Sequence, residues 1–466
     1  MPSSPPRPLS SRGVGEPGFR RVSFGEALSL WTKIGFLSFG GPAGQIALMH
    51  SELVDRRKWI DEQRFLHALN YCMLLPGPEA QQLAIYVGWL LHRVPGGVAA
   101  GVLFVLPGFL AVLGLSLMYA LLRELPAVAA LFFGLKAAVL ALVVEAVLRI
   151  GKRALKSRFL VLLAIAAFAA LFLFGVPFPV VVLLAGLLGY LNSRGERNGA
   201  AQAQHVMEEE PASLIAWLAA RGELEHTRAS PAKALRVLVV CMALWLLPLW
   251  FLASRFGVRS VFVEEGVLFS KAALVTFGGA YAALAYVAQR AVEVHAWLSA
   301  SEMVDGLGLA ETTPGPLILV LEFVGFMAAF RAPAGLSPWI AGVLGASVTV
   351  WVTFVPCFLW IFLGAPYIEA LRGNRSLSAA LSGITAAVVG VIANLAIVFA
   401  SHVVFRDVQT LSFGPLRLLR PIWSSIDVAA FVLAALAMVA MLRLKLGLVW
   451  TLSGCALLGA AWKLTR

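Results

Sequence analysis

The chain has 466 residues, of which 60% are hydrophobic and only 13% are charged, and its formal net charge is +12. This is too little polar surface to cover a soluble globule of that size, so the composition excludes a soluble domain and indicates a membrane protein. The positive residues lie between apolar runs and near the termini, where the positive-inside rule accounts for them, so we expect no nucleic-acid partner.

The first segment, residues 1–22, is rich in Pro, Ser, Gly and Arg and contains no apolar stretch. We expect a disordered cytoplasmic tail rather than a cleavable signal peptide. Residues 23–191 form the first of two predicted repeats. They contain six apolar runs, each compatible with a helix that crosses a hydrocarbon core about 30 Å thick. The runs lie near 24–49, 66–91, 98–122, 127–148, 159–174 and 176–191.

A polar linker, residues 192–233, follows the sixth run and is predicted to be cytoplasmic. Within it, a short amphipathic helix near 212–220 is the alternative to a plain solvated segment. Residues 234–254 are predicted to form one extra transmembrane helix. Residues 255–466 form the second predicted repeat, with apolar runs near 263–288, 303–330, 338–363, 378–401, 423–442 and 446–462.

The two repeats are copies of one unit. Phe39-Gly40-Gly41 recurs 238 residues later as Phe277-Gly278-Gly279, and Pro76-Gly77-Pro78 recurs as Pro314-Gly315-Pro316. After an insertion of eleven residues the offset becomes 249. Six crossings plus one unpaired crossing would deliver the second copy upside down, as in many secondary transporters. The predicted fold is therefore an all-α polytopic membrane protein with two homologous halves, arranged as inverted repeats, and about 12–13 transmembrane helices.

Glycine and proline interrupt the first two runs of each half. Neither Gly-Gly-Pro nor Pro-Gly-Pro supports a continuous helix. Broken backbone in a bilayer is tolerated where it is packed in protein or lines a watery cavity, and a helix that begins after a break offers free N–H groups to an anion. The alternative is that these residues only permit close packing and kinks. The predicted substrate-binding residues are Gly40, Gly41, Pro42, Pro76, Gly77, Pro78, Gly278, Gly279, Pro314, Gly315 and Pro316.

Charged and amide side chains near the breaks extend this site. Lys33 and Lys271 lie seven residues before their Gly-Gly pairs and could add positive charge, or each could snorkel or pair with the carboxylate seven residues earlier on its helix. Gln81 follows the first Pro-Gly-Pro and could donate to an oxyanion. Glu79 is the predicted proton-coupling group. Glu322, another carboxylate in an apolar run, could instead belong to an internal ion pair.

No enzymatic pattern competes with a transport site. The seven histidines never occur in HxxxH or HExxH spacing, the four cysteines lack metal-ligand spacing, and the chain has no Walker loop. We therefore expect no enzyme activity, no metal and no cofactor. Energy for transport would come from an ion gradient or the membrane potential.

The motifs resemble one known family. Phe39-Gly40-Gly41-Pro42, Trp59-Ile60 and Leu74-Leu75-Pro76-Gly77-Pro78 are similar to the chromate ion transporter family over roughly residues 24–190 and 262–460. The resemblance implies a multi-pass protein of the bacterial inner membrane, or the archaeal plasma membrane, that exports chromate, confers resistance to it and draws on the proton gradient or membrane potential. One departure is that Ala280, not proline, follows the second Gly-Gly, so we expect the first half to hold more of the substrate contacts.

The partners implied are chromate, protons as coupling ions and the lipid bilayer, and the sequence leaves a homodimer open. Two other readings also stay open. One is a carrier of sulfate or another oxyanion without chromate specificity, and the other is a membrane structural or sensory protein that transports nothing.

Overall fold

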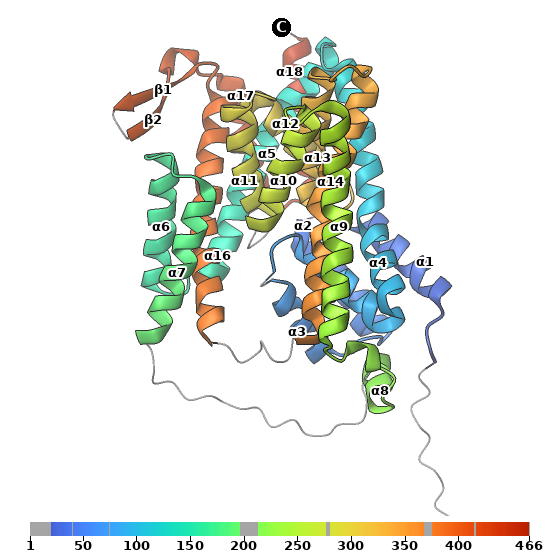
Figure 1. Cartoon of the computed structure of the whole chain (residues 1–466). Coiled ribbons are helices and arrows are strands. Elements are labelled where there is room, and N and C mark those ends of the chain that lie inside the picture. The colour runs from blue at the N-terminus through green and yellow to red at the C-terminus, as the bar shows by residue number, and fades with distance from the viewer. Residues whose placement is uncertain are drawn as a thin grey trace, which may run out of the picture.

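The computed structural model describes residues 20–39, 41–73, 75–195, 213–275, 280–367, 375–413 and 416–465. Helices dominate this part of the chain and form one upright bundle (Figure 1). Gly40, Gly278 and Gly279, all three predicted to bind substrate, lie outside the described residues. So do nearly all of the predicted tail and the first part of the predicted linker.

The first half opens with two helices that turn back inside the bundle. They are α1 (Phe24–Leu37) and α2 (Gly41–His50), which continues as the π-helix η1 (Ser51–Arg56). Both ends of this hairpin contact the later part of the linker: Arg21 forms an ion pair with Glu223 at 2.7 Å, and the N–H of Leu214 donates to the carbonyl of Lys58 at 2.9 Å. The run at 24–49 therefore enters and leaves at the lower end of the molecule in Figure 1.

The next pair, α3 (Glu62–Cys72) and α4 (Glu79–Leu122), contains a second reversal. The 44-residue α4 is two helices, because His92 and Arg93 have non-helical dihedrals and Arg93 has φ 57°. A Cβ built on Gly88 would lie 2.5 Å from the carbonyl oxygen of Gly96, so the two parts run back along each other in close contact. The part from Glu79 thus descends from the Pro-Gly-Pro turn, and the chain then rises through the whole bundle.

The remaining helices of the first half and the linker region follow in order. They are α5 (Pro126–Ala154), α6 (Arg158–Phe172), α7 (Phe178–Gly195), α8 (Leu214–Ala220), η2 (Glu225–Thr227) and α9 (Pro231–Phe256). The short α8 buries Leu214, Ile215 and Leu218, so the end of the linker is a packed helix rather than a plain solvated segment.

The second half contains a corresponding series of helices. Its first elements are α10 (Val261–Val275), α11 (Ala280–Ala288), η3 (Gln289–Val294), α12 (Ala300–Thr312), η4 (Leu317–Leu319), α13 (Val320–Arg331), α14 (Pro338–Gly364) and η5 (Ala365–Tyr367). The helices α10 to α13 occupy the upper part of Figure 1, whereas α1 to α3 occupy the lower part.

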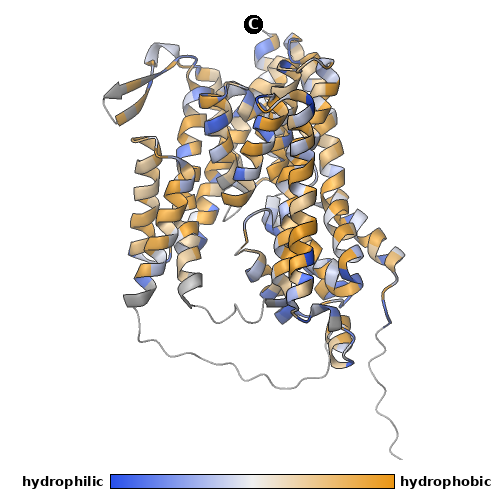
Figure 2. Cartoon of the chain, in the orientation of Figure 1, coloured by the Kyte–Doolittle hydropathy of each residue, from blue (hydrophilic) through white to orange (hydrophobic). Residues whose placement is uncertain are grey.

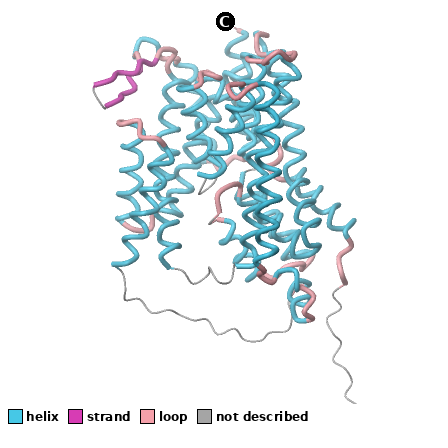
Figure 3. Tube along the Cα trace, in the orientation of Figure 1, coloured by secondary structure: helices cyan, strands magenta, loops and turns pink. Residues whose placement is uncertain are grey.

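The last elements are α16 (Arg375–Val404), β1 (Val408–Phe413), β2 (Leu416–Pro421), η6 (Trp423–Ser425), α17 (Val428–Met438), η7 (Val439–Arg443) and α18 (Leu448–Leu464). Strands β1 and β2 pair antiparallel, with Val408 opposite Pro421. This hairpin is an addition to the predicted all-helical fold. It projects from the upper end of the bundle, where Figure 3 shows it in magenta.

Equivalent positions of the two halves make equivalent contacts. Gly134 of α5 packs against the backbone of Cys455 in α18, and Gly383 of α16, at the 249-residue offset, packs against Ala185 of α7. In both pairs a Cβ on the glycine would meet a carbonyl oxygen, so each close approach requires glycine. The duplication seen in the sequence is therefore also a duplication of packing.

Five helices are long and apolar enough to cross a membrane, within the ranges that the structure describes. They are Glu79–Leu122, Pro126–Ala154, Pro231–Phe256, Pro338–Gly364 and Ala379–Val404. Hydrophobic residues predominate along them and along their shorter neighbours (Figure 2). The apolar runs counted as spans at 24–49, 66–91, 263–288 and 303–330 are instead pairs of shorter helices with breaks between them. Non-helical segments consequently lie inside the bundle as well as at its ends (Figure 3).

Candidate substrate site

The breaks of the two halves meet. The N–H of Gly315 donates to the carbonyl of Ser38 at 2.8 Å, and Nε2 of Gln45 donates to the carbonyl of Gly315 at 2.6 Å. Ser38 follows α1 and Gln45 lies in α2, so the tip of the lower hairpin is bonded to the Pro-Gly-Pro turn of the upper half. Ser38 and Gln45 are both buried. Sequence reasoning stopped at the glycines and prolines and did not identify either side chain.

Each Pro-Gly-Pro turn also packs against the long helix of the other half. A Cβ on Gly77 would lie 2.9 Å from Sγ of Cys357 in α14, and one on Gly315 would lie 3.2 Å from Cα of Gly108 in α4. Cys357 and Gly108 are equivalent positions at the 249-residue offset. Gly77 has φ 115° and Gly315 has φ 100°, a backbone region that suits glycine. Both turns therefore depend on glycine for conformation as well as for space.

The helices that start at the breaks have backbone N–H groups without side-chain caps. The residue before α4 is Pro78 and the residue before η4 is Pro316, and neither provides a side-chain cap. The first N–H groups of a helix have no partner within the helix, and together with the helix dipole they favour an anion. Gly41 begins α2 with φ 71°, and a Cβ built on it would meet nothing within 4 Å. Space is therefore open beside one of these breaks, next to the half-buried Pro42.

Two glutamines and a glutamate follow the first Pro-Gly-Pro. Gln82 donates from Nε2 to the carbonyl of Pro76 at 2.7 Å and so supports the turn. Gln81 is buried, its Nε2 lies 3.5 Å from the carbonyl oxygen of Gly101, and its Oε1 has no hydrogen-bond partner. Glu79, the first residue of α4, is half-buried. The amide of Gln81 thus has hydrogen-bonding capacity that the protein leaves largely unused.

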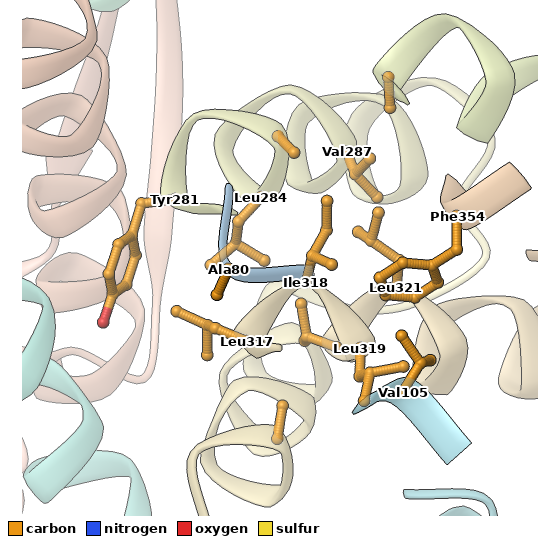
Figure 4. Packing of buried hydrophobic residues seen from close by; sticks show 14 of the residues in the cluster. Ala80, Val105, Tyr281, Leu284, Val287, Leu317, Ile318, Leu319, Leu321 and Phe354 are labelled. Atoms are coloured by element: carbon orange, nitrogen blue, oxygen red, sulfur yellow. The ribbon is translucent and has the colours of Figure 1, made fainter. Parts of the chain in front are cut away.

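The second Pro-Gly-Pro has an apolar setting instead. Leu317, Ile318 and Leu319 follow Pro316 and are all buried. Figure 4 shows them packed among Leu284, Val287 and Phe354 of the same half and Ala80 and Val105 of the first half. The polar groups at the breaks therefore come mainly from the first half.

Buried carboxylates form a further feature, of which sequence reasoning identified only Glu322. The hydroxyl of Tyr281 in α11 donates to Oε1 of Glu311 in α12 at 2.8 Å, and both residues are buried. Glu311 lies three residues before Pro314, so proximity to a break was a signal that could have found it. Glu265 and Glu322 are fully buried, and none of their carboxylate oxygens has a hydrogen-bond partner. A buried carboxyl group without a partner is costly when ionised, which favours its protonated form.

Lys33 and Lys271, the two lysines predicted to lie at the substrate site, differ in whether they form an ion pair. Nζ of Lys33 lies 2.8 Å from Oε1 of Glu52 in η1, so its partner is not Glu26. Hydrogen bonding from Lys33 and its positive charge lower the pKa of Glu52 against the opposing effect of burial. Lys271 is exposed and forms no ion pair with any described residue. Neither lysine is brought into contact with a Pro-Gly-Pro turn.

A cavity of about 360 Å³ lies away from these turns, between the tip of the α6–α7 hairpin, α11 and α16. Gln289, Asn394 and His402 line it among apolar residues. Nδ1 of His402 is bonded to the carbonyl of Val398 in its own helix. The cavity contains none of the duplicated glycines and prolines, so it is a weaker candidate than the site at the breaks.

Comparison with known proteins gives one family. The family model described as "Chromate transporter" matches residues 26–190 and 264–460. The chain is similar to the "Chromate transport protein" of Pseudomonas aeruginosa, with 33% identity over 84% of this chain and 85% of that protein. It is 28% identical to the "Chromate transport protein" of Cupriavidus metallidurans over 79% of this chain and 81% of that one. It is also 25% identical to the "Probable chromate transport protein" of Synechococcus elongatus, over 83% and 87% of the two chains. No solved structure gives a significant match.

Proposed function

Since the chain belongs to the chromate transporter family and is a multi-pass membrane protein, we propose that it exports chromate across the bacterial inner membrane and thereby confers resistance to it. The observation that carries this proposal is the meeting of helix breaks from both halves, with Gly315 bonded to Ser38 and Gln45. Broken helices at the interface of two repeats are where secondary transporters bind their substrates.

Chromate, a tetrahedral dianion, suits the groups at the breaks. N–H groups at the starts of α2 and α4 would bind its oxygens, and the amide of Gln81 would add a side-chain donor. The open space beside Gly41 would admit the ion. We propose Gly40, Gly41, Pro42, Pro76, Gly77, Pro78 and Gln81 as the principal site. Gly278, Gly279, Pro314, Gly315 and Pro316 would complete it.

We further propose that the halves are inverted repeats and that transport alternates access between the two ends. The lower and upper hairpins meet through Gly315 and Ser38, and the Pro-Gly-Pro turns pack on opposite long helices. Sliding of one repeat against the other would break and remake these contacts and expose the site to either end.

Protons are the proposed coupling ions. Glu79 is the group nearest the first Pro-Gly-Pro that can carry a proton, and the Tyr281–Glu311 pair lies just before the second. A carboxylate that is protonated while the site is empty and ionised while chromate is bound would exchange a proton for chromate and so link the two movements. Lys33 and Lys271 would act less directly, by adding positive charge along the approach to the site.

The lower end of the molecule is the proposed cytoplasmic end. Lys152 and Arg153 lie there, in the last turn of α5, as do the linker segment and Arg21, in accord with the positive-inside rule. The proposed division is a tail at 1–22, repeats at 23–191 and 255–466, a linker at 192–233 and an extra helix at 234–254.

The nearest alternative is a carrier whose main cargo is sulfate or another oxyanion. Sulfate is also a tetrahedral dianion, and backbone N–H groups would distinguish it poorly from chromate. Uptake of labelled chromate into inverted membrane vesicles tests both readings, with and without a proton gradient and with excess sulfate as competitor. We expect chromate uptake that depends on the proton gradient and that excess sulfate inhibits less than excess unlabelled chromate does.

Stronger inhibition by sulfate than by unlabelled chromate would favour the sulfate carrier. Uptake that ignores the gradient would indicate a channel-like permease, and no uptake of either ion would indicate a protein that does not transport. The matching site variant is Gln81→Met, which removes the proposed side-chain donor, leaves the backbone of the breaks in place and should reduce the uptake.

A further inference from the structure

A pocket lined by basic residues lies at the lower end, apart from the helix breaks. This pocket of about 240 Å³ is formed where α4 reverses, α9 begins and α14 ends. Arg93, Arg228, Lys233 and Arg236 line it, and all four are exposed. None of them forms an ion pair with a described residue. Four cations around one pocket, with no carboxylate among its described lining residues, create a site for a negatively charged group.

His226 joins this pocket to α4. Its Nε2 lies 3.0 Å from the carbonyl oxygen of Trp89, and the two rings stack edge to face. Burial lowers the pKa of His226, and the charges of Arg93 and Lys233 lower it further. The imidazole is therefore neutral at pH 7 and donates to Trp89. It serves as part of the wall, while the positive charge comes from the arginines and Lys233.

Apart from Ser230, the rest of the wall is apolar. It is formed by Trp89, Val94, Ala234, Val237, Phe362, Leu363 and Pro366. A small inorganic oxyanion has no use for such a surface, because it is hydrated and has no apolar part. A ligand that combines an anionic group with hydrocarbon would use both the cations and this wall.

The pocket also opens beside the lipid-facing surface of two helices. Leu235 and Val239 of α9 are 62% and 58% exposed, and Val94 and Val98 of α4 are 47% and 42% exposed. In a bilayer these residues contact acyl chains, and Lys233 and Arg236 stand in the first two turns of α9, at the level of the headgroups. Basic pockets between transmembrane helices at such a level bind the phosphate of anionic lipids.

We infer that this pocket binds the headgroup of an anionic phospholipid, with its phosphate among Arg93, Arg228, Lys233 and Arg236 and its acyl chains along α4 and α9. The site is independent of the proposed transport reaction. Because it joins the reversal of α4 to the ends of α9 and α14, a bound lipid would hold elements of both halves together at this end.

The test measures lipid binding to the purified full-length protein in neutral detergent. Dioleoylphosphatidylglycerol and dioleoylphosphatidylcholine are titrated separately, and bound lipid is counted by native mass spectrometry. The pocket variant is Lys233→Gln with Arg236→Gln. The matched control is Lys152→Gln with Arg153→Gln, which removes two exposed cations at the same end of the molecule but outside the pocket.

We expect the pocket variant to bind phosphatidylglycerol about 25-fold more weakly than the wild type, or about 5-fold for each charge removed. The control should bind it as the wild type does, and phosphatidylcholine should not distinguish the three proteins. Arg228→Gln, which lies outside the helices, should weaken binding about 5-fold and guards against misfolding of α9 in the double variant.

Equal phosphatidylglycerol affinity in the pocket variant and the wild type would overturn the inference, as would an equal loss in the control. A sulfate titration at constant ionic strength separates the second anionic source. Displacement of phosphatidylglycerol by sulfate, or sulfate binding that only the pocket variant loses, would assign the pocket to a free oxyanion instead. Because binding is the readout, the outcome does not depend on whether the protein transports chromate.

Discussion

Two buried glutamines of the first half should respond differently to the same substitution. Gln45 donates to the carbonyl of Gly315 at 2.6 Å, whereas Nε2 of Gln81 lies 3.5 Å from the carbonyl oxygen of Gly101. Methionine is similar in length and unbranched, so Gln→Met removes the amide with little change in packing. In Gln45→Met the Gly315 carbonyl loses a buried donor, which costs about 1–3 kcal/mol. In Gln81→Met almost no internal hydrogen bond is lost.

We therefore expect Gln45→Met to lower the apparent melting temperature in detergent by about 1–3 °C, and Gln81→Met to leave it nearly unchanged. Transport should show a different pattern, because Gln81 is the proposed substrate donor. Gln81→Met should reduce gradient-dependent chromate uptake by about tenfold, the loss of one hydrogen bond to a charged group. Equal destabilisation by the two substitutions, or full uptake by Gln81→Met, would refute the reasoning.

Three other substitutions test separate parts of the structure. Glu79→Gln should abolish the dependence of chromate uptake on the proton gradient while leaving chromate binding intact; an unaltered pH dependence of uptake would remove Glu79 from the coupling step. Gly41→Leu and Gly315→Leu should both stop uptake. Only Gly315→Leu should greatly reduce the yield of folded protein in membranes. A Cβ at position 315 would lie 3.0 Å from Cδ1 of Leu319, whereas a Cβ at position 41 would meet nothing within 4 Å. For Glu302, burial alone would raise the pKa, but hydrogen bonds from Arg331 and its charge lower it to about 2. The ionised carboxylate therefore stabilises the upper end above about pH 4.5, and this stability is lost as the pH falls toward 2. Near neutral pH, Glu302→Gln should have a lower melting temperature than the wild type. As the pH falls toward 2, its melting temperature should change less than that of the wild type. Identical dependence of the two melting temperatures on pH would contradict this assignment.

The sequence by itself determined the class of protein and the places where its helices break. Apolar composition requires a bilayer whatever the arrangement of helices, because no soluble fold could hide so much hydrocarbon. The duplicated Gly-Gly and Pro-Gly-Pro motifs interrupt helices for local backbone reasons. The family resemblance rested on the same residues and is confirmed by the match over both halves.

Only the tertiary structure decided whether the chain continues across the bilayer or turns back after each break. An apolar run has the same hydropathy whether it crosses the bilayer or turns back, so the return of α1–α2 to the lower end and the reversal at Arg93 could not be predicted from composition. The same holds for partners distant in sequence. Lys33 is paired with Glu52, and Gly315 is bonded to Gln45 across 270 residues. These pairings depend on how the two halves pack, which local sequence does not encode.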